Sequence, residues 1–174
     1  MPDRALSLNP IFSPTQVLGQ LHSGQLFYVL AAPGNAIILC HPHHAEIVGP
    51  NAAVGGVLDI DCHRLIPLGK VALTYPESYQ KRRQAFITRR QWICATQKAV
   101  NCAAPLKRAR AIVLMVAKYC GWSVVRDLED EALAQIVGVL PSTIATARHA
   151  ITRELRAKAR SPRSPAPASR VHLS

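Results

Sequence analysis

The chain has 174 residues, 49% of them hydrophobic, which is enough to bury a core and excludes a disordered polypeptide. Its formal net charge is +11. Residues 1–74 carry three Lys or Arg against four Asp or Glu, and residues 75–174 carry eighteen against six, so balances of −1 and +12 make up that total. The positive field of the second part would attract a polyanion such as a nucleic acid.

We expect a cytoplasmic protein that makes no membrane contact. The opening segment MPDRALSLNPIF lacks the pattern of a signal peptide, and stretches such as FYVLAAPGNAIILC are too short and too broken to span a bilayer. An odd number of cysteines without a CxxC spacing argues against a disulfide framework and suits a reducing compartment; they are Cys40, Cys62, Cys94, Cys102 and Cys120.

Between Leu26 and Val71 the apolar residues form short runs separated by turn signals. LFYVLAA is followed by PGN, AIILC by HPHH, and AEIV by GPN. Runs of this length bounded by Pro, Gly and Asn are typical of antiparallel strands. Residues 1–76 are therefore predicted to form a small β-rich module.

The next segment, residues 77–104, is predicted to be one long helix. From Glu77 to Ala103 there is neither Pro nor Gly, and a stripe recurs at helical spacing: Tyr79, Arg83, Phe86, Ile87, Arg90, Ile93 and Cys94. Such a helix is about 40 Å long, too long to be covered by a small sheet alone. We expect the stripe to pair with a second copy of the chain, the alternative being a bridge between two domains.

Shorter helices follow. PLKRARAIVLMVAKYCG is predicted to be helical, then a short link, WSVVRD, leads to the helix LEDEALAQIVG. Gly138 can end that helix in the left-handed conformation, and Pro141 suits the first turn of a helix over about 141–159. Residues 161–174 are rich in Pro, Ser and Arg and are expected to be a disordered basic tail.

Two helices joined by a three-residue turn that contains Gly predict a helix-turn-helix, whose second helix enters the DNA major groove. Its inward positions would be Leu133, Ile136, Val137, Ile144, Ala147 and Ile151. Hydroxyls on the outer face can contact base edges, and Arg side chains would mostly hold phosphates. The predicted DNA-binding residues are Ser142, Thr143, Thr146, Arg148, His149, Arg153 and Arg156, with Lys158 as a further phosphate contact.

LEDEALAQIVGVLPSTIATARHAI resembles the helix-turn-helix of the cyclic-AMP receptor protein and fumarate-nitrate regulator family of bacterial transcription factors. The upstream segment from SYQKRRQAFITRRQ to KRARAIVLMVA is similar to that family's dimerisation helix and the helix after it, and IVGPNAAVGGVLDI looks like part of its β-barrel sensor. The resemblance implies an α+β fold with a degenerate barrel (1–76), a dimerisation helix (77–104) and a winged-helix-like domain with a reduced wing (105–160). It implies a homodimer that binds double-stranded DNA, activates or represses transcription, and meets RNA polymerase.

The sequence differs from the family at the motifs that bind its effectors. Its cyclic-nucleotide cassette has a Gly-Glu pair and an Arg-Ser or Arg-Thr, whereas here Gly55 and Gly56 are followed by Val57 and no such Arg pair follows. Its iron–sulfur members carry clustered N-terminal cysteines, which are absent here. We therefore expect no cofactor, and a cyclic nucleotide least of all.

A second candidate site is the segment CHPHH together with the later pair Cys-His. Thiolates and imidazoles suit zinc, copper, iron or haem. The candidate ligands are Cys40, His41, His43, His44, Cys62 and His63, but their spacing matches no standard zinc module. We expect a polar turn here, with a metal- or haem-responsive regulator as the alternative.

Other functions stay open. ATARHAITRELR is also similar to the last helix-turn-helix of sigma factors, and a basic helical protein can bind DNA in an architectural role without reading sequence. An enzyme is not expected, because the sequence has no Gly-rich phosphate loop, no paired carboxylates in apolar surroundings and no nucleophile motif.

Overall fold

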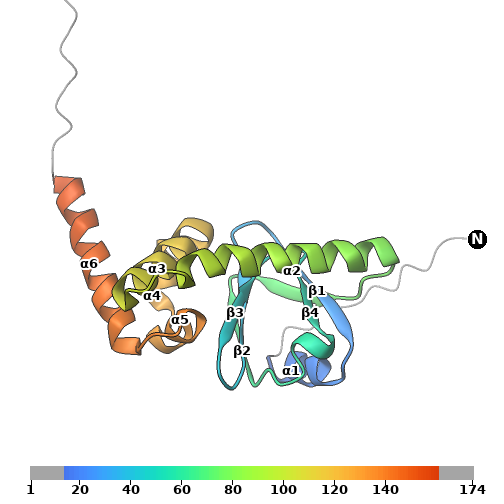
Figure 1. Ribbon diagram of the computed structural model, residues 1–174. Helices are drawn as coiled ribbons and strands as arrows, with labels where there is room; N and C mark the ends of the chain where they lie inside the picture. Colours follow the sequence, from blue (N-terminus) through green and yellow to red (C-terminus); the bar gives the residue numbers. More distant parts are fainter. Residues whose placement is uncertain (1–13, 161–174) are drawn as a thin grey trace, which may run out of the picture.

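The computed structural model describes residues 14–160, which form an α+β fold of six α-helices and two antiparallel three-stranded sheets (Figure 1). The basic tail expected over 161–174 and any wing after Arg160 lie outside the described residues. No helix within the described range combines the length and the apolarity that crossing a membrane requires.

The β-rich module follows a short helix, α1 (Pro14–His22). One sheet has the order β4 (Ala53–Gly55), β1 (Leu26–Ala31) and β6 (Val71–Thr74), and the other has the order β3 (Ala45–Val48), β2 (Ala36–Cys40) and β5 (Arg64–Leu68). The antiparallel prediction is confirmed. The expected barrel is corrected, because in residues 14–160 the two sheets stay separate and three short strands each are too few to close one.

Strand β2 is buried on both of its faces. Ile37 and Leu39 point between the sheets, where they meet Phe27 and Val29 of β1 in one apolar cluster. Ile38 and its neighbours at alternate positions point the other way, toward the helices. This explains why AIILC reads as a continuous apolar run rather than as an alternating one.

The long helix predicted from the sequence is present as α2 (Tyr79–Val100), followed by α3 (Pro105–Cys120), α4 (Trp122–Asp127), α5 (Asp130–Val137) and α6 (Pro141–Arg160). The segment WSVVRD, which we expected to be a link, is helix α4. Gly121 adopts a φ of 96°, which turns the chain so that a new helix begins at Trp122 and buries Val125.

The helices share a core with the outer face of the second sheet. Ile38 and Ile47 of that sheet lie in one cluster with Val113 of α3, Leu133 of α5 and Ile144 of α6. Helix α5 contacts β2 and β3 directly. The β-rich module and the helices of residues 105–160, which the sequence predicts as separate domains, therefore pack against each other.

Helix α2 lies across the β-rich module with its other face in solvent (Figure 1). Its buried side is Ala85, Arg89 and Ala99, with Trp92 half-buried between them. The stripe expected to make contacts is largely exposed: Tyr79, Phe86, Ile87 and Ile93 keep 79, 45, 40 and 37% of their surface accessible. Within residues 14–160, the apolar stripe of α2 therefore remains partly open to solvent.

Alkylation rates will distinguish the five free thiols of the folded chain. Burial raises the pKa of Cys62 and that of Cys120 to about 11, so at pH 8 only about one in a thousand of either is the reactive thiolate. Iodoacetamide should modify the exposed Cys94 first, as peptide mass spectrometry will show. In denaturant all five should react, and equal rates for Cys62 and Cys94 in the folded protein would contradict this burial.

Candidate nucleic-acid interface

Helices α5 and α6 form a tight hairpin through a three-residue turn. Gly138 ends α5 in the left-handed conformation, with φ 61° and ψ 52°, and α6 begins at Pro141. The predicted end of a helix at Gly138 and the predicted start of the next at Pro141 are therefore both confirmed. The six positions expected to face inward are all buried: Leu133, Ile136, Val137, Ile144, Ala147 and Ile151. This packing fixes which face of α6 is turned away from the core.

The outer face of α6 carries most of the predicted DNA-binding side chains. Ser142, Thr146, His149, Arg153 and Arg156 are exposed. The Thr146 hydroxyl donates a hydrogen bond to the Ser142 carbonyl oxygen at 2.9 Å. Since its only proton is used within the helix, Thr146 can offer a base its methyl group and an acceptor oxygen.

Thr143 and Arg148 are placed differently from the rest. Thr143 is half-buried. Arg148 points toward the end of α4, where its guanidinium donates to the Val125 and Leu128 carbonyl oxygens, and its Nε lies 2.7 Å from Asp130 Oδ1. These contacts hold α6 against α4 and α5, so Arg148 has the geometry of a positioning residue rather than of a free phosphate contact.

The one acidic residue of α6, Glu154, is neutralised within the protein. Arg110 of α3 donates to its two carboxylate oxygens at 2.9 and 2.6 Å. These hydrogen bonds hold the pKa of Glu154 below its usual range. The exposed Arg153, Arg156 and Lys158 therefore face solvent without a competing carboxylate on their own helix.

A groove of about 1550 Å³ runs between α4 and α6. Trp122 and Arg126 of α4 line one wall, and His149, Arg153 and Arg156 of α6 line the other. Sequence reasoning missed Trp122 and Arg126, because WSVVRD was not recognised as a helix. The groove places an aromatic ring and a further cation beside the outer face of α6.

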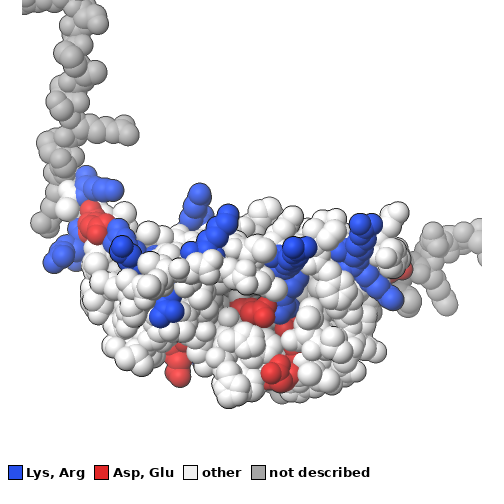
Figure 2. Space-filling view, viewed as in Figure 1, with Lys and Arg blue, Asp and Glu red and all other residues white. Residues whose placement is uncertain are grey.

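The positive charge continues over the helical side of the molecule. Lys and Arg side chains stand along the edge followed by α2 and gather again at α6, while Asp and Glu are fewer (Figure 2). The segments Tyr79–Val100 and Pro105–Cys120 contain no acidic residue at all. A polyanion could contact both regions at once.

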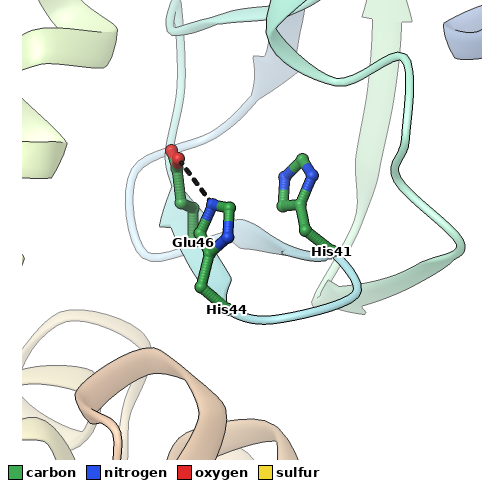
Figure 3. A group of neighbouring side chains, drawn as sticks. All are labelled: His41, His44 and Glu46. Atoms are coloured by element: carbon green, nitrogen blue, oxygen red, sulfur yellow. Dashed lines mark ion pairs between the residues drawn. The ribbon is translucent and has the colours of Figure 1, made fainter.

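The Cys and His candidates do not form one site. Cys40 faces the core shared with the helices, whereas Cys62 belongs to the cluster between the sheets. His43 and His63 are exposed. The structure instead brings His41 and His44 next to Glu46, and one ligand atom from each lies within 4.8 Å of the others (Figure 3). Sequence analysis missed Glu46, which lies on strand β3 outside the CHPHH motif.

A buried ionic network ties α2 to the β-rich module. Arg89, 3% exposed, donates to Glu46 Oε2 from Nε at 3.0 Å and from Nη2 at 2.7 Å. It also donates to the Ala53 carbonyl at 2.9 Å and to the two carboxylate oxygens of Asp59 at 3.0 and 2.8 Å. Asp59, fully buried, accepts a further hydrogen bond from the Gly55 N–H at 2.6 Å.

This network keeps its acid ionised. Burial alone would raise the pKa of Asp59, but the His41 imidazole 3.5 Å away and the hydrogen bonds and charge of Arg89 outweigh burial and lower it. Asp59 is thus a buried carboxylate that depends chiefly on the guanidinium of Arg89. Removing Arg89 would leave that charge inside the protein without its main compensation.

Comparison with known proteins adds no further assignment. No protein-family model matches the chain, and a comparison with curated proteins finds no relative.

Proposed function

We propose that this chain is a sequence-specific DNA-binding regulator of transcription that acts as a homodimer in the cytoplasm. Helices α5 and α6 would serve as its helix-turn-helix, with residues 141–159 in the major groove. The resemblance to the cyclic-AMP receptor protein and fumarate-nitrate regulator family supports the same reading.

The observation that carries the proposal is the division of α6 into two faces. Ile144, Ala147 and Ile151 hold one face in the core. The opposite face presents polar and cationic side chains next to a basic groove and two acid-free helices. Major-groove readers need such a helix, anchored on one side and polar on the other.

The dimer would cover the exposed stripe of α2. Phe86, Ile87 and Ile93 lie on the side of α2 that faces away from the sheets, and a second copy related by a twofold axis would bury the same residues from both chains. Two copies of α6 would then read half-sites about 34 Å apart, one turn of the DNA helix.

Replacement of Arg153 by Ala is expected to weaken binding to all DNA sequences and to lower the slope of log affinity against log salt concentration by about 1. Thr146→Ala, or Ser142→Ala, should instead change the preferred base pairs, by about 1 kcal/mol at each affected position. Selection of binding sites from random DNA, followed by titrations at several salt concentrations, measures both effects.

Lys70→Ala is the matched control, since it removes one exposed positive charge from the turn between β5 and β6, outside α6. It should leave affinity and salt slope close to those of the parent. If Lys70→Ala and Arg153→Ala lowered the affinity equally, the charge of the whole protein and not α6 would account for binding.

The same experiment distinguishes the other DNA-binding roles. An architectural protein would show little preference for any selected sequence over random DNA. A sigma-like subunit would bind stably only after RNA polymerase is added. The polar residues on the outer face of α6 favour sequence reading, because an architectural role requires only the cations.

A further inference from the structure

The turn between β2 and β3 brings two imidazoles together. The backbone N–H of His41 donates to the backbone carbonyl oxygen of His44 at 2.8 Å, which closes the turn. The rings are stacked, with centroids 4.5 Å apart and planes inclined by 4° (Figure 3). Glu46, on the strand that follows, adds a carboxylate whose Oε1 lies 3.4 Å from His44 Nε2.

One nitrogen of His41 is buried without a hydrogen-bond partner. His41 is 1% exposed, and its Nδ1 lies 2.7 Å from Asp61 Oδ1, which fixes the proton on that side of the ring. Among residues 14–160 the other nitrogen, Nε2, finds no hydrogen-bond partner, and it lies 3.5 Å from Asp59 Oδ1. A buried polar atom without a hydrogen bond costs about 1–3 kcal/mol. Asp59 and Asp61 raise the pKa of His41, so a metal ion at Nε2 would take the place of a proton there.

We propose that His41, His44 and Glu46 bind a divalent transition-metal ion of the zinc class. Two imidazoles and one carboxylate are a donor set that zinc uses when it keeps a fourth coordination position for water or another ligand. This site contains no thiolate, so it differs from the Cys and His combination that the sequence suggests. The proposal does not depend on DNA binding.

Two neighbouring residues orient the ligands. Asp61 holds His41 in the tautomer that leaves Nε2 free, which is the usual carboxylate–histidine arrangement around a bound metal. Arg89 occupies Oε2 of Glu46 and leaves Oε1 for the ion. The carboxylate that would hold the metal therefore also anchors α2.

The three ligand groups must move slightly closer together to bind one ion. Ligand atoms around one tetrahedral zinc ion lie about 3.3–3.6 Å apart, given bonds of about 2.0–2.2 Å. The three groups here lie within 4.8 Å, so they must approach by roughly 1 Å. His44 can supply that movement, because its side chain is 54% exposed.

Competition between the full-length protein and a chromogenic chelator for Zn²⁺ at pH 8, without DNA, tests the site. The parent should bind one Zn²⁺ per chain. His44→Gln should lower the affinity about 10-fold or more, and Asp61→Asn about 10–100-fold through its effect on His41. Both residues are exposed, so neither variant should unfold, unlike a change at Glu46 or His41.

His43→Gln is the matched control, because His43 is exposed one residue from His44 but lies outside the cluster. It should leave the affinity within about 2-fold of the parent, well inside the 10-fold losses above. Equal losses for His43→Gln and His44→Gln, or no binding by the parent, would overturn the proposal.

Cobalt substitution gives an independent readout. Co²⁺ bound by imidazole and carboxylate alone lacks the intense near-ultraviolet band that a thiolate ligand produces. A spectrum without that band supports the assigned site. A strong thiolate band would show that cysteines hold the metal and that the assignment to His41, His44 and Glu46 is wrong.

Discussion

Replacing Arg89 by Met will lower the free energy of unfolding by about 3–5 kcal/mol. The substitution keeps an unbranched apolar stem but removes the guanidinium that pairs with Asp59 and Glu46. Asp59 is fully buried, so its charge would remain in the interior without its main partner. Urea unfolding followed by circular dichroism measures the change.

The adjacent residue supplies the control. Arg90 is exposed, and Arg90→Met should change the free energy of unfolding by no more than about 0.5 kcal/mol. Adding Asp59→Asn to Arg89→Met should recover part of the loss, because it removes the uncompensated charge. If Arg89→Met and Arg90→Met were equally stable, the network would contribute little to folding.

Gly55→Ala is the second substitution expected to have a large effect, a loss of about 3 kcal/mol or more in the free energy of unfolding. Gly55 adopts φ 81° and ψ −155°, a region open essentially to glycine alone. A Cβ at this position would also lie 2.4 Å from the Gln25 carbonyl oxygen, a backbone atom that cannot turn aside. The shift would disturb the Gly55 N–H that donates to Asp59.

Gly19→Ala is the opposite case and serves as the control. Gly19 lies in α1, and a Cβ there would meet nothing within 4 Å. Because Ala favours helix over Gly, this variant should gain about 0.5–1 kcal/mol. Thermal unfolding of the two variants should therefore give shifts of opposite sign, and a shared sign would contradict the strain assigned to Gly55.

Local sequence signals were enough to predict much of the helical part of the fold. Gly138 and Pro141 marked the end of one helix and the start of the next because each acts through its own backbone conformation. The absence of Pro and Gly after residue 76 likewise predicted α2. The pairing of the strands could not be predicted. Strand β1 pairs with both β4 and β6, and the residues of a single strand do not identify partners so distant in the chain.

The sites depended on distant partners, which sequence reasoning could not supply. Arg89 and Arg90 are identical and adjacent, yet only one meets carboxylates that lie 30 and 43 residues away. Arg148 and Arg153 look alike on one helix but are turned about 140° apart at 100° per residue, which directs one inward. Glu46 was not predicted as a site residue for the same reason. Its contacts come from the turn between β2 and β3 and from α2, which only the fold brings together.

The core shared by the sheet and the helices has a consequence for cutting the chain. A fragment that begins at residue 105 would lose Ile38 and Ile47, which cover part of the surface formed by Val113 and Leu133. Such a fragment would expose this apolar face to water and should aggregate rather than fold. The helical segment is therefore not a portable module, and the whole of residues 14–160 should unfold in a single transition.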